Sequence, residues 1–265
     1  MKIFSKELFK LEFKRSFKGL LTWSLSIGLT MVFVIVLYPM VKDIYSSIPA
    51  QYADFLDSFG GIPHNILEYF ATEGGLMLQL FGSIFAVLEG FNAINRDERE
   101  KTVESLYQLP YTRSLFFRTK LLRVFTNVLI FAFINYILSY ISFFIVKESI
   151  DFGQFSYFNL LNMIQLIIIA FLGFGLACFL KPNQKNMIAF SIPFPLYIIS
   201  VLSTMTNNAT LEKLKYLTPF TFSNPVDILK SSATFEWISF VVFCSLTVVV
   251  IFLSYIRFNK REFMV

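Results

Sequence analysis

The feature that most constrains this chain is its six long apolar stretches, separated by connections that are alternately rich and poor in lysine and arginine. A helix that crosses a bilayer needs about 20 mainly apolar residues. Two candidates are weaker, because the second is short unless it runs on to Phe91 and the fifth contains two prolines. The six stretches are 20–38, 74–88, 124–146, 160–180, 187–202 and 237–256. The sequence therefore predicts an all-α membrane protein with six transmembrane helices, organised as a single transmembrane domain over residues 1–265.

The distribution of basic residues predicts the orientation of these helices. Eighteen of the 23 Lys and Arg residues fall before the first stretch, in the second and fourth connections, and after the sixth stretch. Cytoplasmic segments carry the excess of basic residues in membrane proteins. Both termini are therefore predicted to be cytoplasmic in a multi-pass protein of the cell membrane. The largest outer connections are predicted at 39–73 and 203–236.

Composition excludes one class of partner. Hydrophobic residues make up 55% of the chain, and 34 of its 265 residues are Phe. The net charge of +5 is the difference between a basic inner side and an acidic first outer connection. We therefore expect no nucleic-acid partner, because the basic side suits the anionic lipid of a cytoplasmic leaflet. Cys178 and Cys244 lie within apolar stretches, where they behave as small buried apolar residues.

The N-terminal tail has a regular pattern of lysines. They recur every fourth residue, beside an apolar side that includes Phe4, Leu8 and Leu11. This pattern is typical of an amphipathic helix that lies in the membrane interface, although a basic flank that merely orients the first span would also explain the charges. Residues 1–19 are predicted to form such an interfacial helix. Its membrane-interface residues would be Lys2, Lys6, Lys10, Lys14 and Lys18.

The connection after the second stretch is predicted to form a short charged helix over residues 95–110. Asn95 and Glu98 resemble a capping box, and Pro110 is a helix terminator. Three apolar residues fall at i, i+3 and i+4, so they would share one face of that helix. They are Val103, Leu106 and Tyr107. A solvated loop helix explains the charges but not the apolar face, whereas a docking surface for a cytoplasmic partner explains both.

These motifs resemble a known family. The run Thr102-Val-Glu-Ser-Leu106, followed by Pro110 and Arg113, resembles the segment after the second span of ABC-2-type transporter permeases. Residues 9–15 are similar to the N-terminal elbow helix of that family, and residues 217–222 resemble a segment that often precedes its last span. Many relatives have Gly before the threonine. This chain has Lys101 there, so a turn that requires Gly is not expected.

The resemblance implies a fold and a mechanism. It implies a membrane subunit of an ATP-driven exporter, with an elbow helix and a short cytoplasmic coupling helix. Such a subunit pairs with a second permease, in a homodimer or a heterodimer, and ATP-binding subunits dock on its cytoplasmic face. The coupling helix would transmit the movement of the ATPase to the spans. The resemblance assigns ATPase coupling to Arg99, Thr102, Val103, Glu104, Leu106 and Tyr107.

The chain itself lacks the motif that binds nucleotide. It contains no Gly-x-x-x-x-Gly-Lys-[Ser/Thr] phosphate loop, and no Gly-Lys pair occurs in it. Such a loop cradles the phosphates of ATP and positions Mg²⁺. We therefore expect no catalytic residue, cofactor or metal site on this chain, which would be a transport subunit rather than an enzyme. ATP and Mg²⁺ would bind to the partner ATPase.

An intramembrane enzyme is one alternative. His64 and Glu68 stand at i, i+4, but two ligands make a poor metal site. Glu89 is a carboxylate near the inner end of the second stretch, and it suits an ion pair with Arg96 on the same helical face better than catalysis.

An ion-coupled secondary transporter or channel is the stronger alternative. It needs ionisable residues inside its spans, yet five of the six stretches have none in their interiors. Their polar residues, such as Asn127, Asn135, Gln165 and Ser191, suit contacts between helices. The apolar spans favour an amphipathic or hydrophobic cargo, such as a peptide, a lipid or a drug, whose identity the sequence does not specify.

Overall fold

The structure is a computed structural model that describes residues 4–48, 61–100, 110–204, 213–230 and 235–261. Within these ranges all regular structure is helical. Six of the helical segments are long and apolar enough to cross a membrane. The prediction of an all-α protein with six transmembrane helices is therefore confirmed.

Two of the six segments, the second and the fifth, join more than one helical element. The first is α1 (Lys6–Ser46), and the second runs without a break through α3 (Ile66–Tyr69), the π-helical η2 (Phe70–Gly75) and α4 (Leu76–Arg99). The third and fourth are α6 (Arg113–Val146) and α7 (Phe152–Phe179). The fifth combines the 3-10 helix η3 (Asn186–Ser191) with α8 (Pro193–Thr204), and the sixth is α11 (Trp237–Lys260).

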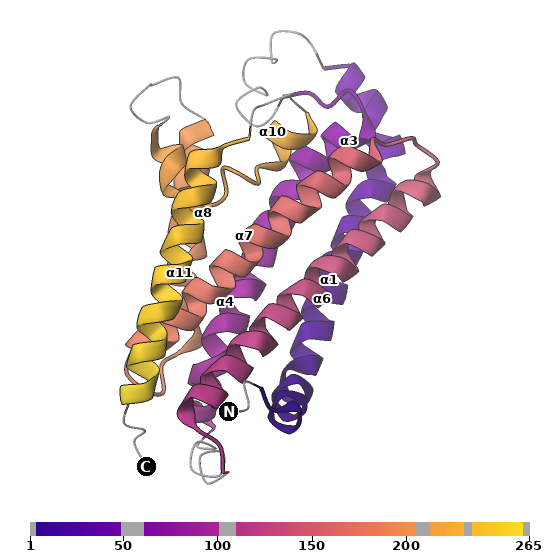
Figure 1. Cartoon of the computed structure of the whole chain (residues 1–265). Coiled ribbons are helices and arrows are strands. Elements are labelled where there is room, and N and C mark those ends of the chain that lie inside the picture. Colours follow the sequence, from indigo (N-terminus) through magenta and orange to yellow (C-terminus); the bar gives the residue numbers. More distant parts are fainter. Residues whose placement is uncertain (1–3, 49–60, 101–109, 205–212, 231–234, 262–265) are drawn as a thin grey trace.

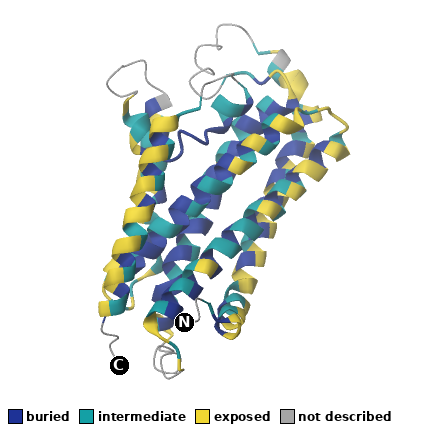
Figure 2. Cartoon of the chain, viewed as in Figure 1, coloured by how far each residue is buried: buried dark blue, intermediate teal, exposed yellow. Residues whose placement is uncertain are grey.

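In the bundle, α4 and α7 lie in the centre (Figure 1). α1 and α6 lie on one side of this central pair, and α8 and α11 lie on the other. Burial follows this order, because 67% and 61% of the most apolar window are buried in the second and fourth segments, against 22–33% in the other four. Exposed apolar side chains cover the outer faces of α1 and α11 (Figure 2), as expected of surfaces that meet lipid.

The central pair packs backbone against backbone. A Cβ atom added to Gly90 of α4 would lie 1.8 Å from the carbonyl oxygen of Ala170 in α7. A Cβ added to Gly173 of α7 would lie 2.6 Å from the carbonyl oxygen of Val87. Small residues allow such close approach between membrane helices, where packing rather than water expulsion drives association.

The predicted outer connection at 203–236 is partly buried. Its described parts include η4 (Lys213–Leu217) and α10 (Pro225–Leu229), and the segment between them turns into the bundle. Phe220 and Ser223 are fully buried there, and the amide of Gln79 on α4 donates hydrogen bonds to the carbonyl oxygens of both. The Ser223 hydroxyl in turn donates to Gln165 on α7. These bonds satisfy backbone groups that lipid could not.

The N-terminal prediction needs a correction. Lys6 to Gly19 are helical, but they are the first turns of the continuous helix α1 rather than a separate elbow helix. Figure 1 shows these turns nearly end-on, at an angle to the rest of α1. Ser5 caps the helix, since its side chain accepts a hydrogen bond from the amide of Leu8. Both termini lie at the same end of the bundle (Figure 1). We call it the inner end, because the sequence predicts it to be cytoplasmic.

Candidate functional site

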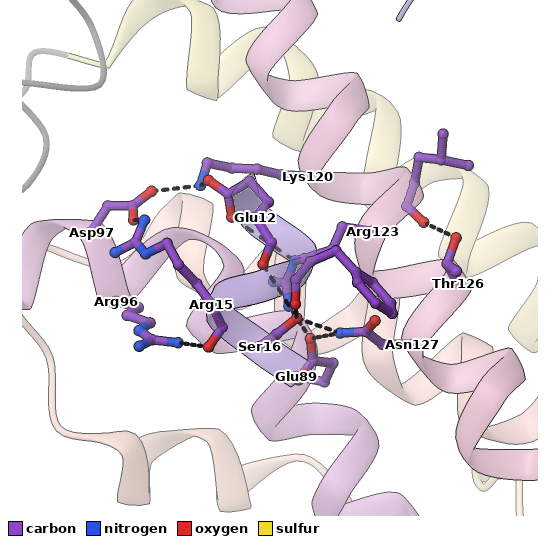
Figure 3. Close-up of polar contacts among 12 residues, drawn as sticks. Glu12, Arg15, Ser16, Glu89, Arg96, Asp97, Lys120, Arg123, Thr126 and Asn127 are labelled. Atoms are coloured by element: carbon purple, nitrogen blue, oxygen red, sulfur yellow. Dashed lines mark hydrogen bonds and ion pairs between the residues drawn. The ribbon is translucent and has the colours of Figure 1, made fainter. Parts of the chain in front are cut away.

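At the inner end, charged side chains from α1, α4 and α6 converge in one cluster (Figure 3). The ammonium group of Lys120 on α6 is at its centre, and the residue is only 1% exposed. It donates hydrogen bonds to the carboxylate of Glu12 on α1, at 2.7 Å, and to that of Asp97 on α4. Two carboxylates therefore compensate one buried cation, as burial of a charge requires.

A second group lies one turn further along α6. The guanidinium of Arg123 pairs with the carboxylate of Glu89 on α4. The amide of Asn127 donates to the same carboxylate at 2.7 Å and to the hydroxyl of Ser16 on α1 at 2.8 Å. Glu89 does form an ion pair, as the sequence suggested, but its partner is Arg123 on another helix rather than Arg96.

A third group links the start of α1 to the end of α4. Arg15 donates to the carboxylates of Asp97 and Glu100, at 2.7 and 2.9 Å. Arg96 donates to Glu100 at 2.7 Å and to the backbone carbonyl of Arg15 at 2.8 Å. The hydrogen bond from Arg96, and then that from Arg15, hold the pKa of the Glu100 carboxyl below its usual value. This carboxylate therefore stays ionised across the physiological pH range.

Glu98 connects the same end of α4 to α7 and α11. Its carboxylate lies 2.9 Å from the guanidinium of Arg261, the residue that follows α11. Arg261 is buried and also donates to the backbone carbonyl of Ala177 near the end of α7, at 2.7 Å. Its own carbonyl accepts a hydrogen bond from Arg113, the first residue of α6. The neighbours Asp97 and Glu98 thus bind opposite sides of the bundle.

A cleft of about 340 Å³ opens beside the cluster. One face of α1 and one face of α4 form its walls, and Asn186 of η3 contributes at one end. Charged groups line one part of the cleft, whereas Trp23, Phe85 and Leu88 line another. The space is therefore amphipathic.

The structure describes only part of the predicted ATPase-coupling surface. Arg99 is the last residue of α4 and donates a hydrogen bond to the side chain of Asn186, at 2.7 Å. The other five residues, Thr102, Val103, Glu104, Leu106 and Tyr107, lie outside the described residues. Their helix and its role therefore stay predictions.

The predicted start of the coupling helix is wrong. Asn95 is not a helix cap but an internal residue of α4. Its side chain forms two hydrogen bonds with the backbone of Gln184, in the loop after α7. Hydrophobic periodicity does not show that α4 extends past Asn95, because its last turn is charged. That turn is helical in the bundle because Asp97 and Glu98 have partners on other helices.

The remaining predicted residues are the lysines of the N-terminal tail and the pair His64 and Glu68. Lys6, Lys10, Lys14 and Lys18 are all exposed on α1, which leaves their membrane-interface role a prediction. Lys2 lies outside the described residues. The carboxylate of Glu68 accepts a hydrogen bond from the backbone amide of His64. No group of three or more His, Cys, Asp or Glu side chains that could hold a metal ion occurs in the described part of the chain.

Sequence reasoning missed the central residues of the cluster, because it counted Lys120 and Arg123 only as cations of a loop. Two signals point to them. Lys120, Arg123 and Asn127 fall at i, i+3 and i+7, so they share one helical face. Glu12 is one of two acids, with Glu7, among the lysines of the tail, and an acid in so basic a segment suits a cation on another helix as its partner.

Comparison with known proteins agrees with this architecture. A family described as ABC-2 family transporter protein matches residues 7–263. No curated protein matches the chain. The family match spans the whole described bundle, including the inner cluster and the cleft. This multi-pass membrane chain therefore belongs to the ABC-2 family of transporter proteins, whose members form the membrane-spanning part of ABC transporters.

Proposed function

We propose that this chain is the membrane subunit of an ATP-driven exporter of amphipathic or hydrophobic molecules. ATP is hydrolysed by a separate subunit that docks on the inner end, around residues 101–109. A second permease subunit, identical or related, completes the path. The phosphate loop that ATP hydrolysis requires is absent from the sequence, which supports assignment of that step to a partner.

The observation that carries the proposal is the double linkage at the end of α4. Asp97 is bonded to Lys120 of α6 and Arg15 of α1, whereas Glu98 is bonded to Arg261 after α11. Residues 101–109 follow this point directly. A displacement applied there would reach both sides of the bundle through short, charge-assisted hydrogen bonds, which are among the strongest available.

The same cluster bears on the main alternative. An ion-coupled transporter would need ionisable groups that release and rebind an ion within the spans. In the described residues, the carboxylates of the cluster sit at the inner end of the bundle and each has a basic partner. This arrangement favours a mechanical role for the charges over ion transport.

The orientation is tested by labelling single cysteines in intact cells, after Cys178 and Cys244 have been replaced. His64 and Lys213 are exposed at the end opposite the termini, and Lys185 is exposed at the inner end. We expect an impermeant thiol reagent to label cysteine at positions 64 and 213 but not at 185 or 101. Labelling of positions 185 and 101 alone would reverse the proposed orientation.

The function is tested with the purified permease–ATPase complex in lipid. We expect amphipathic peptides or lipids to raise its ATPase activity, and sugars or simple ions to leave it unchanged. Leu106→Asp should lower both co-purification of the ATPase and the stimulated rate, because it would place a charge where an apolar side chain is expected to dock. The loss of a buried apolar contact and the added charge together should weaken binding roughly 10- to 100-fold.

Ser105→Asp is the matched control. It adds the same charge to the same segment, off the apolar face of Val103, Leu106 and Tyr107. We expect this variant to retain the ATPase. If Leu106→Asp co-purifies with the ATPase as well as the parent does, the docking face is wrong, and stimulation by sugars or ions alone would contradict the proposed cargo.

A further inference from the structure

The cleft at the inner end has a graded polarity. Arg96 and Arg99 line it near the end of α4, and Phe85 and Leu88 line it three to four turns deeper. At 1.5 Å per residue, the distance from Phe85 to Arg99 along the helix is roughly 20 Å. The cleft therefore extends from the inner surface of the bundle toward its apolar interior, and Glu89 and Asn92 line the stretch between its two ends.

The charged groups that line the cleft balance, four basic against four acidic, and the buried Lys120 behind them adds a fifth basic group. Five basic residues and four acidic residues make up the cluster and its cleft. The basic residues are Arg15, Arg96, Arg99, Lys120 and Arg123, and the acidic residues are Glu12, Glu89, Asp97 and Glu100. Four of the basic residues form ion pairs with these acids. Arg99 differs, because its hydrogen-bond partner among the described residues is the neutral amide of Asn186.

Two polar atoms of the described residues that line the cleft have no hydrogen-bond partner. Within the described residues, the side-chain oxygen of Asn92 is buried and has no hydrogen-bond partner, and the same holds for Nε of Arg123. Arg123 is only 4% exposed, and its Nε lies 4.0 Å from Glu12. A buried polar atom without a partner costs about 1–3 kcal/mol, so an occupant that bonds to these atoms would be favoured.

The apolar part can hold a hydrocarbon chain. The rings of Trp23 and Phe85 pack against each other in the cleft wall, tilted by 46° and with centroids 6.2 Å apart. Gly19 of α1 leaves the space beside it open, since a Cβ added there would meet no atom within 4 Å. A chain of methylene groups would bury apolar surface against these residues.

We propose that this cleft binds an amphipathic anion, such as an anionic phospholipid of the inner leaflet. Its phosphate would bind Arg99, and its chain would lie against Trp23 and Phe85. Arg99 would then bind the ligand of the cleft, and the residues after Arg99 would contact the ATPase. The inference rests on the proposed function for one point, that the inner end meets the cytoplasmic leaflet.

The chain offers a direct probe of the site, because it contains two tryptophans. Trp23 lines the cleft, and Trp237 is exposed at the far end of α11. With Trp237→Phe, fluorescence reports on Trp23 alone. The protein is reconstituted in phosphatidylcholine with a small fraction of lipid brominated on its chains, either phosphatidylglycerol or phosphatidylcholine. We expect brominated phosphatidylglycerol to quench Trp23 more strongly at the same fraction.

Arg99→Gln should weaken this headgroup preference roughly tenfold, because it removes a charge-assisted hydrogen bond. Lys10→Gln is the matched control, since Lys10 is exposed on α1 and does not line the cleft. It removes one inner positive charge but should leave the preference intact. Gly19→Leu adds a side chain at the cleft wall, where its Cβ meets no atom within 4 Å, and should also abolish the preference.

Equal quenching by the two lipids in the parent would overturn the proposal, as would an unchanged preference in both Arg99→Gln and Gly19→Leu. Equal losses in Arg99→Gln and Lys10→Gln would show only general attraction to a charged membrane, which also overturns it. None of these measurements needs the ATPase. Ligand binding in the cleft can therefore be disproved independently of the proposed exporter function.

The same fluorescence distinguishes two sources of the amphiphile. With the ATPase and ATP present, a resident structural lipid would leave the quenching of Trp23 unchanged. A transported cargo would be drawn from the cleft, and quenching would fall during turnover and recover when ATP is exhausted. Both results support the site, and they assign its occupant to the membrane or to the transport path.

Discussion

Replacing Lys120 with methionine is expected to destabilise the protein by about 3–5 kcal/mol, because it leaves two buried carboxylates without their shared cation. Glu12 is 5% exposed and Asp97 is 4% exposed, so water cannot replace the lost ammonium group. The midpoint of thermal unfolding should fall by roughly 10 °C. It can be measured by the fraction of detergent-solubilised protein that remains monodisperse after heating.

Lys42→Met is the matched control for this change. Lys42 also pairs with a carboxylate, that of Glu148 at 3.8 Å, but both side chains are more than 40% exposed. Exposed pairs contribute about 0–1 kcal/mol, so the midpoint should barely move. If the two lysine variants unfold at the same temperature, the buried cluster does not stabilise the bundle as we infer.

Gly90→Ala is the second substitution with a large expected effect. The new methyl group would lie 1.8 Å from the backbone oxygen of Ala170, and no side chain can move aside to make room. α4 and α7 must therefore separate, and the overpacking should cost about 3 kcal/mol, the upper end of the usual range. We expect a sharp loss of monodisperse protein at the temperature where the parent is stable.

Gly19→Ala provides the comparison, because it makes the same chemical change in a helix with no atom within 4 Å of the new methyl group. It should stabilise the protein by about 0.5–1 kcal/mol, through the helical preference of alanine over glycine. Equal expression and thermal stability of the two alanine variants would contradict the close packing of α4 against α7.

The fold class could be predicted from the sequence because it depends on properties that are local in the chain. The length of an apolar stretch indicates a span, and the basic clusters indicate which connections share a side. Helix ends were less predictable. α6 begins at Arg113 rather than at Val124, and α4 reaches Arg99, because the charged first turns of α6 and the charged last turn of α4 find partners on other helices.

The candidate site depends on contacts between distant residues, which no local pattern contains. Lys120 looks like a loop cation until α6 places it between Glu12 and Asp97. The segment around Ser223 looks like an outer connection until Gln79 and Gln165 bind it inside the bundle. In both cases the sequence shows that a residue is polar. Whether water or another side chain forms its hydrogen bonds is known only once its partner in the fold is known.

The contact between Glu98 and Arg261 also has a consequence for biosynthesis. The two residues are 163 positions apart, so the ribosome completes α4 long before the cation that neutralises its terminal carboxylate exists. Until α11 has been inserted and Arg261 has followed it, Glu98 and the backbone carbonyl of Ala177 must be satisfied by water or by lipid headgroups. The nascent bundle therefore stays open at this end, and its closure marks the arrival of the sixth helix.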